Sequence, residues 1–470
     1  MVAPGFVLAA PKSGSGKTTI STGLLRVLSE QMTVAPFKVG PDYIDPGYHL
    51  LAAGRASRNL DPFLLGGADT VRSLYHTGAE DADIAVVEGV MGLFDGRFDP
   101  HGDVLCPEGS TADVARQLGL PVVLVVDTRG TAQSIGALVR GFATAHPQVR
   151  VAGVIFNRLA SAKHEAMLTQ AVQAVGVPVV GAVPSFPAIE LPSRHLGLVT
   201  AVEQGQTAEA AIAAMADHVR THVDVSALIA LAQPPTVNTT PFAPLVGVAR
   251  AHDLLRGNAP IPGDAAAHPD GPTVAVAAGP AFSFLYTEHL ELLAAFGATT
   301  VLFDPLHDPL PEASALVIPG GFPELYAETL AARDDVRRDI HRLIADGGVV
   351  YGECAGLLWL GRSLDSHRML DVVPTDAVMG ARLTLGYRQA TALTPSPLTA
   401  EGMRVCGHEF HHTKLVSTPE EQWSPMWGWR DNDDVPMREG FVRGKVMASY
   451  LHLHPAAMVD QWRQLVATLA

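Results

Sequence analysis

Cysteine, aromatic side chains and long apolar runs are all scarce in this chain, and each shortage excludes a class of protein. Only three cysteines occur in 470 residues, Cys106, Cys354 and Cys406. They are too few and too scattered for a disulfide framework or a thiolate zinc site. No apolar run approaches the roughly 18 residues of a membrane-spanning helix. The first apolar segment is short and lacks a basic region before it, so it predicts a strand and not a signal peptide. The expected location is the cytoplasm.

Positively charged side chains are also fewer than negatively charged ones. Lysine and arginine number 33 against 48 aspartate and glutamate residues, for a formal net charge of −15. Such a balance disfavours nucleic acid or an anionic membrane surface as a partner, although an acidic protein can still bind small anionic substrates in a local basic pocket. The hydrophobic content of 47% and the length of 470 residues predict a globular protein of two or three domains with large cores.

The first informative segment is an apolar run at residues 6–10, followed by a glycine-rich turn and by apolar residues at helical spacing. Strand, glycine-rich loop and helix in this order form the context of a phosphate-binding loop, whose backbone N–H groups hold a polyphosphate. We expect Lys17 to reach the β- and γ-phosphates of ATP and the Thr18 hydroxyl to ligate Mg²⁺. The predicted ATP-binding residues of the loop are Lys12, Ser13, Gly14, Ser15, Gly16, Lys17, Thr18 and Thr19.

The loop departs from the pattern G-x-x-x-x-G-K-[ST] at one position, because Pro11 stands where the pattern has glycine. Lys12, five residues before Lys17, resembles the signature lysine of the MinD and dethiobiotin synthetase class of P-loop proteins. The alternative interpretation is an ordinary Gly/Ser turn.

Further strands are predicted at residues 33–38, 83–89, 121–126, 151–156 and 178–181, alternating with helical patterns. This alternation predicts a doubly wound parallel sheet, which binds ligands beyond the carboxyl ends of its strands. Polar residues follow several of these strands. Glu88 occupies the Walker B position, where it could hold or orient Mg²⁺. Asp42 and Asp45 lie in a Pro/Gly-rich segment and are not expected in the core, and the alternative for them is a turn with Asx caps.

The second half of the chain begins after a proline-rich connector. The predicted division is a synthetase domain at 1–235, a linker at 236–271 and a second domain at 272–470. A strand at 348–353 ends at Cys354, in a glycine-flanked turn before a helix, which is typical of a nucleophile elbow. The helix N-terminus is expected to lower the thiol pKa, and backbone N–H groups of Gly321 and Ala355 are expected to form an oxyanion hole. The alternative is a buried, inert thiol.

A cysteine on an elbow with a distant histidine resembles the class I glutamine amidotransferases, in the variant attached to cobyrinate and cobyrate synthases. Matching the Y-L-H of that variant places the general base at His452, with His454 as second choice. Ordinary triad enzymes carry an acid two residues after the histidine, and here that position is His454. The segment AGPAF at 278–282 also stands where the family often has an aspartate.

The segment HEFHH at 408–412 formally fits H-E-x-x-H, the zinc protease motif, which requires a helix. Its surroundings predict a strand that enters a turn, and it resembles the G-H-E-F-H segment of the same family. A structural or substrate-side role is therefore expected in place of zinc.

Four further segments carry a more specific resemblance: KVGPDYIDP at 38–46, VEGVMGLFDG at 87–96, GVIFNR at 153–158 and LPSRHLGLV at 191–199. They are similar to the cobyrinic acid and hydrogenobyrinic acid a,c-diamide synthases, glutamine-dependent ligases of cobalamin biosynthesis. The resemblance spreads over nearly the whole chain. It implies a P-loop domain followed by a class I glutamine amidotransferase domain.

The resemblance also implies the reaction. ATP would phosphorylate the c- and then the a-acetate side chain of a corrinoid polycarboxylate, and ammonia from L-glutamine would displace the phosphate. It places Thr18, Asp42 and Glu88 on Mg²⁺, it places Asn157 and Arg158 on the adenine, and it allows a homodimer. The residues assigned to the substrate are Tyr43, Asp45 and Asp95.

Two other functions share parts of this pattern. A MinD/ParA-like ATPase switch would need the phosphate-binding loop but not Cys354, and a regulatory module could carry an inactive glutaminase domain. A sister ligase that acts on cobyrinate diamide is disfavoured by the GPDYIDP segment.

Overall fold

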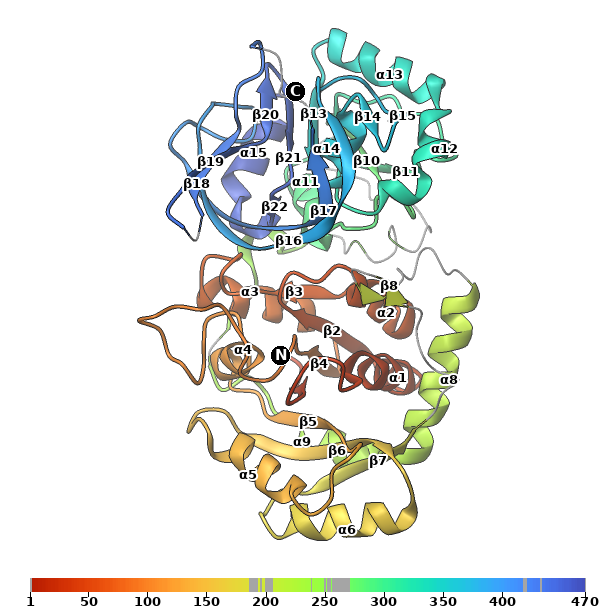
Figure 1. Cartoon of the computed structure of the whole chain (residues 1–470), viewed down its shortest axis with the longest axis vertical. Helices are drawn as coiled ribbons and strands as arrows, with labels where there is room; N and C mark the ends of the chain where they lie inside the picture. Colours follow the sequence, from red (N-terminus) through yellow and green to blue (C-terminus); the bar gives the residue numbers. More distant parts are fainter. Residues whose placement is uncertain are drawn as a thin grey trace. The chain divides into compact units, whose positions relative to one another are not determined.

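The computed structural model describes residues 2–185, 193–194, 197–198, 206–237, 239–248, 251, 255, 271–416, 421–431 and 433–469. The chain divides into two compact units, Met1–Val246 and Gly247–Ala470, which are described separately (Figure 1). The predicted linker at 236–271 lies partly outside the described residues. The family segment at 191–199 lies outside them too, apart from the antiparallel pair β8 (Ser193–Arg194) and β9 (Gly197–Leu198).

The first unit is built on a fully parallel sheet with the strand order β3-β2-β4-β1-β5-β6-β7. Strand β1 lies in the middle; the chain first fills one side of it and then the other. This is the predicted doubly wound arrangement, and the loop after β1 lies at its topological switch point. The strands are β1 (Gly5–Ala9), β2 (Val34–Val39), β3 (Arg58–Leu60), β4 (Ile84–Glu88), β5 (Val122–Asp127), β6 (Val151–Leu159) and β7 (Val179–Pro184).

Helices cover this sheet, and α1 packs against both α2 and α8 (Figure 1). Gly23 of α1 permits this close approach, because a Cβ there would lie 2.6 Å from the carbonyl oxygen of Met215 in α8. The helical segments are α1 (Lys17–Ser29), α2 (Ile44–Ala53), α3 (Ala68–Ala79), α4 (Thr111–Leu118), α5 (Ile135–Thr144), α6 (Ala162–Gln173), α8 (Gln206–His222), α9 (Val225–Leu231) and η2 (Ala243–Leu245).

The second unit contains a six-stranded sheet with the order β11-β10-β12-β13-β21-β20. All neighbouring strands pair in parallel except β20 and β21, which are antiparallel. The predicted parallel sheet of the second domain is therefore confirmed, with one antiparallel edge. Its strands are β10 (Thr273–Ala277), β11 (Thr299–Phe303), β12 (Ala315–Ile318), β13 (Val349–Glu353), β20 (Phe441–Arg443) and β21 (Val446–Ser449).

A second, mostly antiparallel sheet in this unit was not predicted. Its main path is β15-β14-β16-β17-β22, with β18 paired to β16 and β19 to β18. The strands are β14 (Ser363–Leu364), β15 (His367–Arg368), β16 (Asp376–Ala392), β17 (Arg404–Leu415), β18 (Trp427–Arg430), β19 (Pro436–Glu439) and β22 (His452–Leu453).

Strand β17 corrects one expectation, because a turn was predicted directly after Gly407. The strand instead continues through this glycine, where a Cβ would lie 2.7 Å from the carbonyl oxygen of His452. Glycine in a strand interior often marks such a close backbone approach. The HEFHH segment is therefore extended and lacks the helical geometry of a zinc protease motif.

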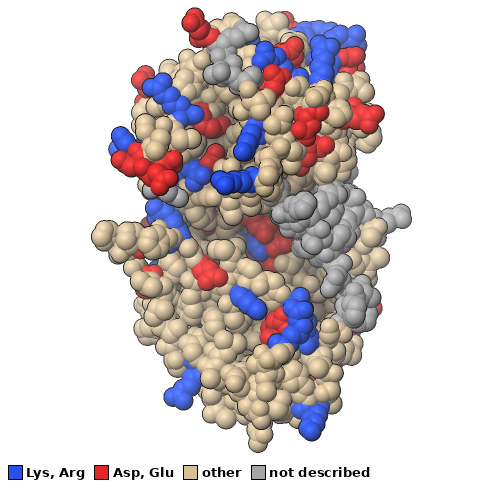
Figure 2. Space-filling view, viewed as in Figure 1, with Lys and Arg blue, Asp and Glu red and all other residues tan. Residues whose placement is uncertain are grey.

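In the second unit, helix α11 packs against α15. Helix α14 follows β13 and lies in the hydrophobic core, where its Trp359 is fully buried. The helical segments are α11 (Thr287–Ala295), η3 (Pro323–Tyr326), α12 (Ala327–Ala331), α13 (Asp334–Ala345), α14 (Ala355–Leu360), η4 (Pro455–Ala457) and α15 (Val459–Ala467). Within the described ranges, no helix has the length and hydropathy required to cross a membrane. On the face shown in Figure 2, acidic and basic side chains are interspersed.

Candidate functional site

The phosphate-binding loop connects β1 to α1, and its backbone is fixed by two polar residues near the carboxyl end of β6. The Asn157 side-chain amide donates to the Ser15 carbonyl at 2.9 Å, and Arg158 Nη1 donates to the Gly14 carbonyl at 2.7 Å. Gly16 has φ 89°, and a Cβ there would lie 2.2 Å from Asn157 Nδ2, so glycine is required at this point. Asn157 and Arg158 thus lie against the loop. Their predicted contact with adenine stays a prediction.

Lys17 begins α1 and is buried. Its Nζ donates to the Met91 carbonyl at 2.5 Å, in the loop that follows β4. Asp95, predicted to face the substrate, accepts the Gly92 N–H at 2.8 Å and so stabilises the turn that presents this carbonyl. Burial, followed by the nearby Lys38 ammonium, lowers the pKa of Lys17 to about 8. The lysine is therefore held beside the predicted phosphate site with part of its hydration already removed.

A buried cluster of charged and polar groups lies behind the loop. Thr18 Oγ1 donates to Glu88 Oε1 at 2.7 Å and lies 3.2 Å from Asp45 Oδ2. Lys38 Nζ donates to the same two oxygens, at 3.1 Å from Glu88 and 2.5 Å from Asp45. His49 Nε2 lies 2.8 Å from the other oxygen of Glu88. Lys38 and Glu88 lie opposite each other on the neighbouring strands β2 and β4, while α1 adds Thr18 and α2 adds Asp45 and His49.

Burial and the neighbouring charges together set the pKa values in this cluster. Burial acts to raise the pKa of Glu88, but Lys38 and His49 hold that pKa well below its usual range. Burial and the neighbouring carboxylates of Asp42 and Glu88 raise the pKa of Asp45 well above its usual value, against the pull of Lys38. One lysine therefore balances Glu88 but does not balance all the carboxylates around it, so the cluster favours an additional positive charge.

The structure corrects the expectation for Asp45, which was placed in a surface loop. Asp45 is only 6% exposed and lies in the first turn of α2. The helix tolerates Pro46 there because first-turn N–H groups lack intrahelical acceptors. Asp42 instead follows the alternative interpretation: its Oδ1 accepts the N–H of Ile44 at 2.8 Å as an Asx cap. Tyr43 lies half-buried between them.

Lys38 and His49 were missed by the sequence reasoning. The available signal for Lys38 was a single lysine inside the otherwise apolar strand VAPFKV. His49 offered no local signal, since its role depends on the way α2 packs beside β4. Lys12 and Ser13 of the loop are exposed, and Thr19 is half-buried.

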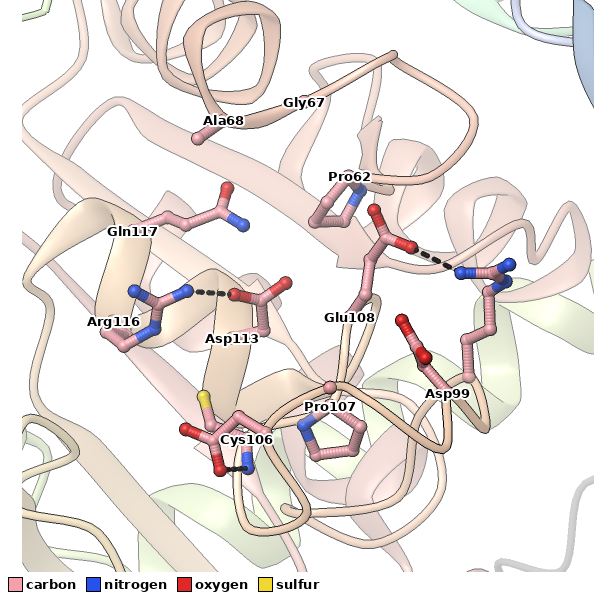
Figure 3. A pocket seen from close by; sticks show the side chains of 13 residues that line it. Pro62, Gly67, Ala68, Asp99, Cys106, Pro107, Glu108, Asp113, Arg116 and Gln117 are labelled. Carbon is pink, nitrogen blue, oxygen red and sulfur yellow. Dashed lines mark hydrogen bonds and ion pairs between the residues drawn. The ribbon is translucent and has the colours of Figure 1, made fainter.

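A pocket of about 310 Å³ lies elsewhere in this unit, near the start of α3 and along α4 (Figure 3). Arg116 Nη2 pairs with Asp113 at 2.7 Å, and Arg97 Nη1 pairs with Glu108 at 3.0 Å. Because both arginines are neutralised and further carboxylates of Asp99 and Asp103 line it, the pocket does not suit a polycarboxylate substrate.

The second candidate site is the turn between β13 and α14. Cys354 adopts φ 48° and ψ −97°, a backbone conformation that non-glycine residues rarely adopt and that marks a nucleophile elbow. Gly356 is needed just after it, because a Cβ there would lie 2.3 Å from the Ile318 carbonyl oxygen. The Cys354 N–H donates to the Ser449 carbonyl at 2.7 Å, and its Sγ lies 3.8 Å from the Phe410 carbonyl oxygen.

The expected lowering of the Cys354 pKa is wrong. Burial, followed by the carboxylates of Glu324 and Glu353, raises the pKa of this thiol, and the backbone N–H of Ala355 opposes the shift only in part. Cys354 is 3% exposed, so desolvation outweighs the helix N-terminus. A nucleophilic role for Cys354 would therefore require a base to remove the thiol proton.

His452 lies at the start of β22, in the segment that follows β21, the neighbour of β13. A Cβ on Gly320 would lie only 2.4 Å from His452 Cε1, so the glycine turn after β12 contacts the histidine directly. The next residue, Gly321, has no room for a side chain either, since a Cβ would lie 2.3 Å from the Ala281 carbonyl oxygen. The structure thus gathers Cys354, His452 and the predicted oxyanion glycine at one end of the sheet.

His454, the second choice for the base, contacts α11 instead. Its ring lies over that of Tyr286 with centroids 4.3 Å apart, and its Nε2 is 4.0 Å from Glu288 Oε2. Its Nδ1 accepts the N–H of Ala456 at 3.2 Å and caps η4. These contacts indicate a structural role and favour His452 as the base.

The HEFHH segment is also accounted for by packing. Glu409 pairs with Arg388 at 2.7 Å, and the ring of His411 stacks on Tyr450 with centroids 3.7 Å apart. In the part of the chain that the structure describes, no group of three or more His, Cys, Asp or Glu side chains is arranged to hold a metal ion.

Two protein-family models match this chain, one within each of its two compact units. The family described as "CobQ/CobB/MinD/ParA nucleotide binding domain" matches residues 6–199, and the "CobB/CobQ-like glutamine amidotransferase domain" matches residues 273–458. The hydrogenobyrinate a,c-diamide synthase of Mycobacterium tuberculosis is 50% identical, with 98% of this chain and 97% of that protein covered.

Two further relatives are similar over the same extent. The hydrogenobyrinate a,c-diamide synthase of Streptomyces coelicolor is 48% identical, covering 98% of this chain and 97% of that protein. The cobyrinate a,c-diamide synthase of Salmonella typhimurium is 39% identical, covering 97% of each chain. The chain therefore belongs to the hydrogenobyrinate and cobyrinate a,c-diamide synthase family, amidating ligases with a P-loop domain and a glutamine amidotransferase domain.

Proposed function

We propose that this protein uses ATP and glutamine to amidate the a- and c-carboxylates of hydrogenobyrinic or cobyrinic acid in cobalamin biosynthesis. The names of relatives at 39–50% identity over nearly the full length support the substrate and the reaction. The observation that carries the proposal is the presence, in one chain, of a phosphate-binding loop beside a buried acidic cluster and of a cysteine elbow beside a histidine. The first arrangement suits carboxylate activation, and the second suits ammonia release.

In the first unit, the loop backbone and Lys17 would bind the phosphates of ATP. The cluster of Thr18, Asp45 and Glu88 offers hydroxyl and carboxylate oxygens, the ligands that Mg²⁺ prefers, and it favours added positive charge. Mg²⁺ sites commonly use one or two carboxylates together with phosphates and water, so a set of three acidic side chains is not required. Bound Mg²⁺ would neutralise charge on the β- and γ-phosphates. We therefore assign Asp45 to this cation site with Thr18 and Glu88, and Asp42 to a peripheral place.

The chemistry of this unit has two steps. An oxygen of the corrinoid carboxylate attacks the γ-phosphorus, the bond to the β,γ-bridging oxygen breaks, and ADP leaves. Ammonia then attacks the acyl carbon of the acyl phosphate, inorganic phosphate leaves, and the nitrogen loses a proton. Lys17 stabilises the charge on the transferred phosphoryl group. Tyr43 and Asp95, which flank the loop and the acidic cluster, are assigned to the substrate side.

In the second unit, Cys354 Sγ attacks the side-chain amide carbon of glutamine. His452 accepts the thiol proton and passes it to the departing ammonia, which leaves a thioester that water hydrolyses to glutamate. The N–H groups of Ala355 and Gly321 would stabilise the tetrahedral oxyanion. Because the thiol pKa is raised, attack and proton transfer to His452 must be closely coupled.

The test combines ATP, Mg²⁺, glutamine and hydrogenobyrinic or cobyrinic acid, with products analysed by mass spectrometry. We expect two successive mass shifts of one amidation each and one ATP consumed per amide. Cys354→Ser should abolish product formation with glutamine and retain it with ammonium, while Cys406→Ser, the matched control, should retain both. ATP turnover that is indifferent to corrinoid and glutamine would contradict the proposal and favour an ATPase switch.

A further inference from the structure

The segment that carries His452 runs from the end of β21 into the short strand β22, and two carboxyl groups bind its N–H groups. Glu439 Oε1 accepts the N–H of Tyr450 at 2.7 Å, and Glu353 Oε1 accepts the N–H of Leu453 at 2.9 Å. His452 therefore lies between two residues whose backbones are each held by a carboxyl oxygen.

Ser449 completes this arrangement. Its hydroxyl donates to Glu439 Oε2 at 2.6 Å and accepts the N–H of Leu451 at 2.9 Å. Three of the four N–H groups from Tyr450 to Leu453 are thus bound by Glu439, Ser449 or Glu353. A segment with so many directed contacts has little freedom to shift its side chains.

The same contacts connect the base to the nucleophile. Glu353 is the last residue of β13 and immediately precedes Cys354, so its carboxyl group joins the nucleophile elbow to the residue after His452. In return, the Cys354 N–H donates to the Ser449 carbonyl at 2.7 Å. The elbow and the base-carrying segment are therefore joined twice, once through backbone and once through Glu353.

Glu353 is 2% exposed, and the basic side chain of His289 lies beside it, with Nε2 3.6 Å from Glu353 Oε2. Burial, followed by the coulombic effect of His454, lowers the pKa of His289 to about 3, so this imidazole is neutral and supplies no positive charge. Burial raises the pKa of Glu353 itself to about 8. A carboxyl group buried without a cationic neighbour is costly, and such groups concentrate at functional sites.

We propose that Glu353 and Glu439 are positioning residues for the glutaminase reaction, which hold the His452-bearing segment in register with Cys354. They act on the backbone of the base, whereas the acid of an ordinary triad binds the imidazole, and position 454, where that acid would stand, is occupied by histidine. The inference rests on the proposed glutaminase activity of Cys354 and His452.

The direct test is to remove the acceptors while keeping the side-chain volume. Glu353→Met and Glu439→Met should each lower kcat for glutamine hydrolysis about 10- to 100-fold, since displacements near 1 Å cost catalysis on this scale. KM for glutamine should change less than about twofold, because neither residue is assigned to glutamine. Glu353→Gln and Glu439→Gln keep a carbonyl acceptor and should retain most of the activity.

The matched control is Glu291→Met. Glu291 lies on α11, is fully buried and, like Glu353 and Glu439, accepts a backbone N–H, in this case that of Ala251 at 3.2 Å. The Glu291→Met variant should keep kcat for glutamine hydrolysis within about twofold of the wild-type value. Ammonium-dependent amidation, measured on the same samples, reports whether each variant retains its folded first unit.

A double-mutant cycle separates positioning from a general loss of structure. The rate at which a chloroketone analogue of glutamine alkylates Cys354 is measured in wild type, Glu353→Met, His452→Asn and the double variant. If Glu353 acts through His452, Glu353→Met slows alkylation in wild type and adds little in the His452→Asn background.

Equal slowing in both backgrounds, or unchanged kcat in both methionine variants, would overturn the inference while leaving the proposed function intact. A wild-type protein without glutaminase activity would overturn the proposed function and this inference together. The two failures are thus distinguishable from the same set of measurements.

Discussion

His408 of β17 and His452 of β22 lie directly opposite each other in an antiparallel strand pair, with ring centroids 4.9 Å apart and an interplanar angle of 24°. Both side chains are almost fully buried. Burial lowers the pKa of His408 to about 3, and burial followed by the neighbouring imidazoles of His408 and His411 holds the pKa of His452 well below its usual range. His452 is therefore neutral, which is the form that a general base requires.

This relationship predicts an unusual pH profile for glutamine hydrolysis. A lowered pKa means that His452 stays unprotonated as the pH falls through 6.5, the ordinary value for histidine. We expect kcat/KM for glutamine to stay within about twofold between pH 7.5 and pH 5.5. A tenfold fall per pH unit below an apparent pKa near 6.5 would show that His452 titrates normally. Circular dichroism over the same range controls for acid unfolding.

Gly320 should be essential to the second site because of its contact with His452, the proposed base. In Gly320→Ala the new Cβ would lie 2.4 Å from His452 Cε1, so the imidazole must move. We expect at least a roughly tenfold loss of kcat for glutamine hydrolysis, on the scale of small displacements at active sites. Ammonium-dependent amidation should be unaffected.

Gly141→Ala is the control for this substitution, since a Cβ at Gly141 would meet no atom within 4 Å. It should retain full activity with glutamine. Equal activity of Gly320→Ala and Gly141→Ala would mean that His452 is not held where the structure places it.

Lys38 should be the main stabiliser of the acidic cluster in the first unit. Lys38→Met removes the ammonium group between Asp45 and Glu88 and leaves the carboxylates to repel each other. Removing one partner of a buried ion pair costs about 3–5 kcal/mol of unfolding free energy. Millimolar Mg²⁺ should restore part of this loss, because a cation bound by the same oxygens replaces the missing charge.

Stability has to be measured separately for the two units. The chain's five tryptophans all lie in the second unit: Trp359, Trp423, Trp427, Trp429 and Trp462. Amide hydrogen exchange in β2 and β4 should therefore accelerate in Lys38→Met, while the unfolding midpoint from tryptophan fluorescence stays constant. Lys163→Met, an exposed position on α6, is the control. Unchanged exchange in β2 would contradict the assigned role of Lys38.

ATP affinity should decline in mildly alkaline solution. The pKa of Lys17 is lowered to about 8 in the free protein, and bound phosphates would raise it by adding negative charge nearby. Binding above pH 8 must then include proton uptake, so the Kd of ATP should rise up to about tenfold per pH unit between pH 8 and pH 9.5. Calorimetry in buffers of different ionisation enthalpy measures that uptake. A Kd of ATP that stays constant over this pH range, with no proton uptake on binding, would contradict the lowered pKa of Lys17.

The features that the sequence predicted correctly are local ones. The phosphate-binding loop and the cysteine elbow are each encoded by adjacent residues, since glycines at fixed positions permit the required backbone path. The parallel sheets followed from alternating strand and helix patterns. These elements fix where Lys17 and Cys354 lie.

The features that were missed depend on which strands are neighbours. Lys38 meets Glu88 only because β2 pairs with β4, and Glu439 meets the segment that carries His452 because β20, which follows Glu439, pairs with β21, which precedes that segment. The pKa of Cys354 was mispredicted for a related reason: the helix N-terminus is visible in the sequence, but the burial that outweighs it is not.

We predict that ammonia released at Cys354 becomes the amide nitrogen of the corrinoid product. The measurement is mass spectrometry of the product formed from glutamine labelled with ¹⁵N in its side-chain amide, in the presence of excess unlabelled ammonium. At a pH where ammonium-dependent turnover is slow, we expect both new amides to carry ¹⁵N in wild type and ¹⁴N in Cys354→Ser. An unlabelled product from wild type would show that the two units do not cooperate in amide transfer.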